Sequence, residues 1–180
     1  MPDDTNMYPR VTAVLKCVGL CPAYGPEAEL ARVRGTALHA ATHMDDEGDL
    51  DDASVDDAVR PYLEQWRKFR AELQPVIVGI EEEVRHEGLR YVGHLDRRVV
   101  MAGREGILDI KSGAEQPWHR LQLSGYSHAV KCKGGLPPRW AVYLTPEAYT
   151  LKRFDDDHSD WSAWVAAISL YHWRQRHGVG

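Results

Sequence analysis

The change of hydrophobic period at Pro75 is the feature that most constrains the fold of this chain. Before it, apolar residues recur at helical spacing, which predicts helices over residues 11–20, 26–44 and 59–73. After it, apolar residues such as Val76, Val78 and Ile80 alternate with a period of two, as is typical of a strand. The pattern predicts further strands and helices, in the order 89–101, 106–111, helix 117–131, 139–144, 148–154 and a final helix capped by Ser159. This order predicts an α/β fold with a central mixed β-sheet of about five strands flanked by helices.

Length and composition suit one domain over residues 1–180, because 180 residues can bury an adequate core. We expect N-terminal helices over 1–74, the sheet with its inner helix over 75–154, and a C-terminal helix over 155–180. The net charge of −5 means that a nucleic-acid partner would need a local basic patch. A membrane span needs about 20 apolar residues, and the chain has no such run. The acidic start and only three cysteines, Cys17, Cys21 and Cys132, predict a cytoplasmic protein.

The segment between Asp45 and Asp57 contains eight acidic residues and no basic one. Like charges repel one another and disfavour packing, so we expect a solvated loop here. A calcium loop of the EF-hand type is excluded, because Leu50 occupies the position where the sharp turn needs glycine.

Two charged residues on one predicted strand carry the chemical signal. Asp109 and Lys111 are two positions apart, so their side chains share a face, whereas Leu108 and Ile110 point into a core. If the preceding turn centres on residues 103 and 104, antiparallel pairing sets Asp96 opposite Lys111. Two carboxylates and an ammonium group therefore converge on one patch of the sheet.

Carboxylates this close repel each other unless a cation lies between them. Magnesium prefers carboxylate oxygen and retains water for a phosphate substrate, and an adjacent lysine can orient or deprotonate the attacking water. The pattern is thus typical of metal-assisted hydrolysis of a phosphodiester. A surface hairpin with ordinary ion pairs is an equally good explanation of the spacing alone, because Asp-x-Lys is common by chance.

An ordered series of motifs resembles the PD-(D/E)XK nuclease superfamily, and more narrowly its RecB-type nucleases and phage recombination exonucleases. The segments that carry the resemblance are Tyr8–Leu15, Arg34–His39, Gly93–Asp96, Ile107–Lys111 and Gln122–Tyr126. They span roughly residues 8 to 130 and occur in the order of the family. The resemblance implies a restriction-endonuclease-like core.

The resemblance also implies a role for each matching residue. The metal ligands would be Asp96, Asp109, the backbone carbonyl of Ile110 and His39. Because imidazole joins the carboxylates, Mn²⁺ should substitute for Mg²⁺.

The catalytic residues implied by the resemblance are Lys111, Glu82 and Gln122. Glu82 would be the outer acidic residue, because it shares a strand face with Ile80 and its spacing to Asp96 suits the motif; its neighbours Glu81 and Glu83 compete for that assignment.

The helix that carries Gln122 and Tyr126 borders the active site and DNA in the family. We therefore expect DNA contacts from Tyr126, and phosphate contacts from Arg98 and Arg120. Arg34, one residue before the helical motif, is placed to hold a terminal phosphate, and arginine suits bidentate phosphate contacts. Nothing in the sequence is similar to a base-reading module, so sequence specificity should be low.

The resemblance implies a divalent-metal-dependent DNA exonuclease of phage-type recombination or DNA processing, leaving 5′-phosphates on linear duplex or single-stranded DNA. A structure-specific or nicking endonuclease and a catalytically silent DNA-binding subunit are the alternatives. A single-strand annealing protein and further copies of the chain are the implied partners, in the bacterial host cytoplasm if the chain is phage-encoded. Relatives with an iron–sulfur cluster carry four cysteines, whereas this chain has three, so we expect no iron–sulfur cluster here.

Overall fold

The computed structural model describes residues 8–21, 26–130, 132, 135–155 and 158–179, without the side chains of residues 26–28. A short 3₁₀ turn at Asp52–Ser54 lies between the second and third helices. The main elements are α1 (Val11–Cys17), α2 (Pro26–Glu47), α3 (Arg60–Leu73), β1 (Val76–His86), β2 (Tyr91–Met101), β3 (Arg104–Ser112), α4 (Pro117–Ala129), β4 (Arg139–Leu144), β5 (Tyr149–Phe154) and α5 (His158–His177). The predicted order of helices and strands is confirmed.

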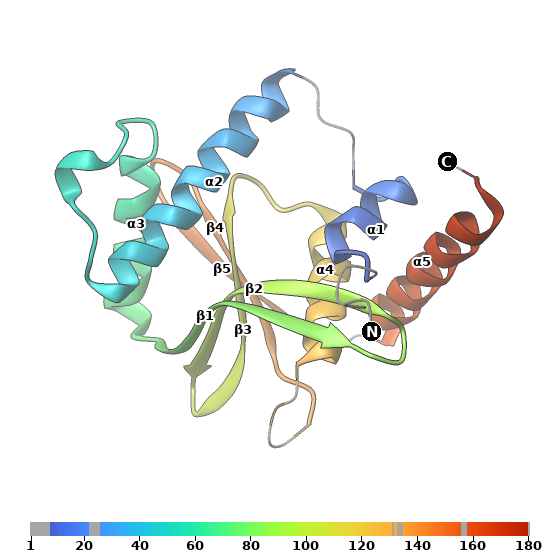
Figure 1. Ribbon diagram of the computed structural model, residues 1–180. Coiled ribbons are helices and arrows are strands. Elements are labelled where there is room, and N and C mark those ends of the chain that lie inside the picture. Colours follow the sequence, from blue (N-terminus) through green and yellow to red (C-terminus); the bar gives the residue numbers. More distant parts are fainter. Residues whose placement is uncertain (1–7, 22–25, 131, 133–134, 156–157, 180) are drawn as a thin grey trace, which may run out of the picture.

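The five strands form one mixed sheet in the order β1-β2-β3-β4-β5. All neighbours pair antiparallel except β3 and β4, which run parallel and are connected through α4. Helices α2 and α3 cover one face of the sheet, and α1, α4 and α5 cover the other (Figure 1). The architecture is the α/β fold with a restriction-endonuclease-like core that we expected.

Strand β3 divides its side chains between the two cores. Leu108 and Ile110 pack against α2 and α3, while Ile107 packs on the α4 side. Successive side chains on a strand alternate between faces, so Asp109 and Lys111 lie on the α4 side as predicted.

The turn between β2 and β3 differs from the one expected. Its two central residues are Ala102 and Gly103, with φ values of 49° and 73°, and Met101 pairs with Arg104. Positive φ at both positions is the geometry of a two-residue type I′ hairpin. This turn lies one residue earlier than expected, which shifts the register by two residues, so Asp96 lies level with Asp109 and not with Lys111.

The acidic segment is not wholly a solvated loop. Asp45 and Asp46 belong to the last turns of α2, and the Asp46 side chain is fully buried. The prediction failed because the compensating arginines lie far away in the sequence: Arg67 and Arg70 on α3 approach Asp45 to 2.6 Å and 3.4 Å.

Helix α5 begins at His158, one residue before the predicted cap. Its Trp164 packs against Gly125 of α4, where an added Cβ would lie 3.1 Å from the indole ring. Within the described ranges, no helix is both long and apolar enough to cross a membrane.

Candidate active site

The site forms where β2 and β3 separate. Their ladder ends at the pair Arg97 and Leu108. Beyond it, Asp96 Oδ2 accepts a hydrogen bond of 2.6 Å from the backbone N–H of Ile110, so a carboxylate replaces the missing strand partner. Asp96 and Asp109 are only 9% and 2% exposed. Two buried carboxylates are thereby held side by side.

Lys111 supplies the positive charge next to these carboxylates. Its Nζ lies 2.6 Å from Asp109 Oδ2 and donates a hydrogen bond of 2.9 Å to Gln122 Oε1. It also lies 5.5 Å from the centre of the Trp118 ring, within range of a cation–π contact. Three groups from β3 and α4 therefore fix the position of the ammonium.

The charge of Asp109 is costly in this environment. Burial raises the pKa of its carboxyl, the nearby Asp96 carboxylate raises it further, and Lys111 opposes the rise. A divalent cation would favour the ionised form in the same way as Lys111.

Helix α2 and strand β1 each bring one further possible metal ligand close to Asp96. His39 Nδ1 lies 3.4 Å from Asp96 Oδ1 and 4.0 Å from Glu81 Oε1. Ligand atoms of the three residues lie within 4.8 Å of one another. Carboxylate oxygens with one imidazole suit Mg²⁺ or Mn²⁺, so the donor set fits a divalent cation.

The structure brings Glu81, and not Glu82, to this group, which corrects the choice made from the sequence. The Glu82 carboxylate pairs instead with Arg98 at 3.0 Å and folds over Gly79. Two irregularities break the simple alternation of β1: a register shift before Gly79, and left-handed backbone at Glu81 with φ of 50°. Left-handed backbone is strained for a residue other than glycine, and strained residues of this kind cluster at functional sites in proteins.

Gln122 and Tyr126 share one face of α4, as their spacing predicts. Gln122 Nε2 donates to Tyr126 Oη at 2.8 Å, while its Oε1 accepts from Lys111. Tyr126 is 5% exposed and packs on Gly93, where a Cβ would meet the ring at 2.5 Å. The ring is buried because Gly93 admits it, and its hydroxyl holds Gln122; the expected DNA contact of Tyr126 stays a prediction.

Arg34 is the predicted phosphate ligand that the structure places beside the site. It lines the same cleft as His39 and Lys111, and its guanidinium lies 4.8 Å from the Tyr62 ring centre. Its buried Nε has no hydrogen-bond partner in the described part of the chain.

Arg98 and Arg120, from which we expected phosphate contacts, do not line the cleft. Arg98 contacts Glu82 and Glu105, and Arg120 donates to Asp160 of α5 at 3.0 Å. Arg120 precedes Gln122 by two residues, about 200° around the helix, so it faces α5 when Gln122 faces Lys111.

Arg97 is buried and connects α2 to the strand that carries Asp96, a role that the sequence pattern did not predict. Its Nε donates to Asp46 Oδ2 at 2.6 Å, and neither side chain is exposed. Nη1 donates to the backbone carbonyl of Asp96 at 2.6 Å, and Nη2 to Thr42 Oγ1 at 3.3 Å. Trp66 Nε1 donates to the other Asp46 oxygen. Helix α2 is thus tied directly to the strand that carries Asp96.

A cleft of about 920 Å³ opens over these groups. One wall comes from α2, and the other from the end of β3 and the start of α4. His119 lines it and accepts from the Gln116 backbone N–H at 3.2 Å. Burial lowers the His119 pKa to about 4, with help from the charge of Lys111, so this imidazole is neutral near neutral pH. The lining includes Arg32, Arg34, His39, Glu81, Lys111, Trp118 and Gln122. His39, Glu81 and Lys111 line this cleft, with Asp96 and Asp109 buried next to them, so the cleft can bind a phosphodiester over a metal site.

Comparisons with known proteins agree with this geometry. The model of the PD-(D/E)XK nuclease superfamily matches residues 25–175. A presumed exonuclease from Eubacterium rectale has a similar structure, with TM-score 0.59 and 9% identity, covering 96% of this chain and 82% of that one. LHK-Exo in complex with dAMP gives TM-score 0.56 and 12% identity, covering 96% and 89%. These likenesses show the fold, and no curated protein matches significantly. Because the family match covers most of the chain, this protein belongs to the PD-(D/E)XK nuclease superfamily.

Proposed function

We propose that the chain is a divalent-metal-dependent DNA exonuclease that hydrolyses phosphodiester bonds and leaves 5′-phosphates. The observation that carries the proposal is the convergence of Asp96 and Asp109 with His39, Glu81 and Lys111, of which the last three line one cleft. The complex of LHK-Exo with dAMP, a 5′-mononucleotide, supports an exonuclease among the nucleases of this fold.

The donor set assigns the cation to the carboxylates of Asp96 and Asp109 and to His39, with Glu81 as the outer acidic residue. The carbonyl of Ile110 is the remaining ligand that the family resemblance implies. When bound, Mg²⁺ or Mn²⁺ would polarise the phosphodiester and lower the pKa of a nearby water molecule.

Lys111 acts on the nucleophile and on the developing charge. Its ammonium is held by Asp109 and Gln122, so it is oriented before substrate enters. From this position it orients the attacking water and neutralises negative charge that develops on the phosphoryl oxygens. Gln122 is a positioning residue, which Tyr126 holds in turn.

The terminal phosphate of the substrate is assigned to Arg34. Its guanidinium lies on the α2 wall of the cleft, and its unpaired Nε offers a donor to an anion. The motif resemblance also supports action on linear DNA in phage-type recombination, beside a single-strand annealing protein and with further copies of the chain enclosing the site.

A comparison of linear and closed circular DNA tests the proposal. Each substrate is incubated with protein in Mg²⁺, Mn²⁺ and EDTA, next to Lys111→Ala and the exposed control Lys68→Ala. We expect metal-dependent loss of linear DNA alone, abolished by Lys111→Ala and unchanged by Lys68→Ala. Cutting of the circle would replace the exonuclease with an endonuclease at the same site. Tight DNA binding without any cleavage would indicate a silent subunit.

A further inference from the structure

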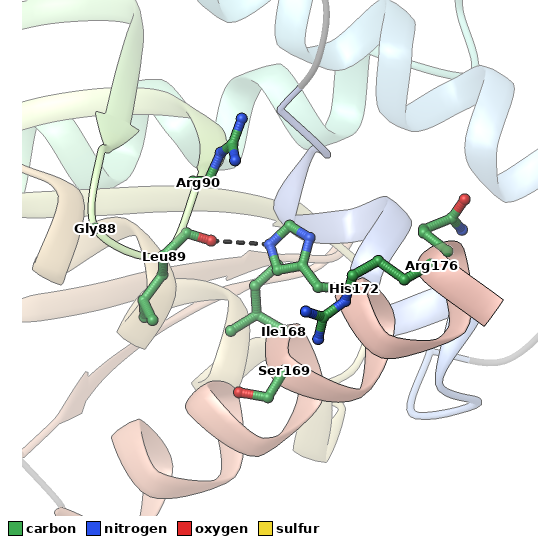
Figure 2. Close-up of a pocket in the computed structure, with 8 residues that line it drawn as sticks. Gly88, Leu89, Arg90, Ile168, Ser169, His172 and Arg176 are labelled. Carbon is green, nitrogen blue, oxygen red and sulfur yellow. Dashed lines mark hydrogen bonds between the residues drawn. The ribbon is translucent and has the colours of Figure 1, made fainter.

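A second cavity lies outside the candidate active site, between the β1–β2 turn and α5. Its volume is about 570 Å³, and Arg90, His172 and Arg176 are among the residues that line it. Figure 2 shows the Arg176 side chain folded back along α5 beside His172, with Arg90 extending from the turn on the other side of the ring. Two arginine side chains and one histidine side chain therefore line the same cavity.

The turn and the helix are connected through His172. Its Nε2 lies 2.9 Å from the backbone carbonyl of Leu89 (Figure 2). A carbonyl can only accept, so Nε2 carries the hydrogen. The bond holds the turn against α5 and thereby fixes the separation between Arg90 and Arg176.

The side chains that line the cavity carry positive and no negative charge, and the Arg90 guanidinium also lies 5.7 Å from the Tyr8 ring centre. No carboxylate is among its lining residues, and residues 161–179 contain no aspartate or glutamate. The nearest acidic residue on the turn, Glu87, accepts a hydrogen bond of 2.8 Å from Tyr8 Oη. Within the described residues, the Arg176 guanidinium has no hydrogen-bond or ion-pair partner, and it is exposed. In a chain with a net charge of −5, this concentration of cations favours an anionic ligand.

The position of α1 relates this cavity to the cleft. Thr12 of α1, and Cys21 just after it, line the cleft. On the α5 side, Arg174 Nη1 donates to the backbone carbonyl of Cys17 at the end of α1. Helix α1 and the residues just after it therefore border the cleft and also contact α5 two residues before Arg176, so a polynucleotide leaving the cleft past α1 would approach this part of α5.

We infer that this second cavity binds a backbone phosphate of the same nucleic acid whose end lies in the cleft. The inference rests on the proposed function and extends it. The cleft and the carboxylates next to it combine negative charge with a lysine, as a cleavage site requires, whereas the second cavity has cationic, polar and apolar residues but no carboxylate in its lining. It holds the substrate without cleaving it, and arginine suits such a phosphate contact.

The length dependence of DNA binding tests this inference. Arg90→Gln and Arg176→Gln are combined in the Lys111→Ala background, with Arg153→Gln on β5 as a matched exposed control. Binding of a labelled duplex shorter than one helical turn and of one of about two turns is measured by fluorescence anisotropy over a range of salt. We expect the double variant to weaken binding of the long duplex about tenfold and to flatten its salt dependence by about one phosphate contact. Binding of the short duplex and the control should not change. Equal losses for both lengths, or no loss, would overturn the inference.

A titration with inorganic phosphate separates this site from the nuclease proposal. The ring resonances of His172 are followed by NMR, and we expect a phosphate-dependent shift in the unmodified protein that Arg176→Gln removes. If the protein neither binds nor cuts DNA, the proposed function fails while this shift still tests the anion site. No shift would overturn the anion site. A shift without length-dependent DNA binding would overturn the polynucleotide as its occupant.

Discussion

Two groups of acidic residues lie along the second half of α2, and they differ in how their charge is balanced. The arginine-paired cluster consists of Asp45, Asp46, Arg67, Arg70 and Arg97. The cluster that we propose to be catalytic, called the catalytic cluster below, consists of His39, Glu81, Asp96, Asp109 and Lys111. In the first, Arg67 also pairs with Asp52 at 2.7 Å, so three guanidiniums face three carboxylates, whereas in the second, one ammonium faces three. Aspartate in the first cluster stabilises the fold, whereas in the second it leaves an excess of negative charge that a divalent cation can balance.

Arg97 connects the two clusters. It pairs with Asp46 in the first and donates to the backbone of Asp96 in the second, and its Nη1 also lies 3.6 Å from Glu81 Oε1. The balanced cluster therefore holds the unbalanced one in place. The following predictions test this division of roles.

Removal of the Asp109 charge should have the largest effect and should affect activity alone. We expect Asp109→Asn to lower the cleavage rate by on the order of 10⁴-fold, because a cation ligand and the partner of Lys111 are lost together. The melting temperature should stay the same or rise, since burial and the Asp96 carboxylate both disfavour the Asp109 charge. Cleavage and thermal melting measured on one preparation decide; retained activity with a lower melting temperature would reverse the assignment.

Removal of the Arg97 charge should do the opposite and lower stability. Arg97→Met removes the fully buried one of the two guanidiniums that lie 2.6 Å from the Asp46 carboxylate, which costs about 3–5 kcal/mol in free energy of unfolding. Arg67→Met, whose guanidinium is partly exposed, should cost less than about 1 kcal/mol. Urea unfolding measures both. Similar losses in the two variants would show that burial does not distinguish these arginines.

Addition of a divalent cation should stabilise the protein through the catalytic cluster only. At a Mn²⁺ concentration of about 100 times its Kd, the free energy of unfolding should rise by about 2.7 kcal/mol. We expect Asp96→Asn to remove this gain and Asp45→Asn to keep it. Thermal melting with Mn²⁺ and with EDTA measures the difference, and an undiminished gain in Asp96→Asn would place the cation elsewhere.

The adjacent glutamates of β1 provide the finest test. Glu81→Gln should lower activity about 10- to 100-fold, as expected for an outer ligand of a metal site. Glu82→Gln should leave activity unchanged, because Glu82 pairs with Arg98 away from the cleft. Steady-state cleavage rates of the two variants settle which glutamate belongs to the catalytic cluster, and the reverse result would restore the choice made from the sequence.

Periodicity predicted the order of the elements and the face shared by Asp109 and Lys111, because alternation and helical spacing are local properties of the chain. The family resemblance pointed to His39, Asp96 and Gln122, which the structure brings together around the cleft with Arg34. The local pattern and the order of the motifs thus indicated which residues lie together around the cleft.

The remaining features depend on contacts that no local pattern contains. The burial of Asp46 depends on Arg97, which is 51 residues away in the sequence. The burial of Tyr126 depends on the missing Cβ of Gly93 on another element. The choice of Glu81 depends on an irregular strand, for which the only sequence signal is Gly79 within the alternating run.

The parallel pairing of β3 with β4 has a consequence for the protein during its synthesis. A nascent chain that has emerged only as far as Lys111 already contains every residue of the catalytic cluster, but β4 has not yet been made. Parallel strands need a crossover connection before they can pair, and such long-range pairing forms slowly. We therefore expect the growing polypeptide to be inert on the ribosome, and hydrolytic competence to appear only after residues through Leu144 have left the exit tunnel and docked.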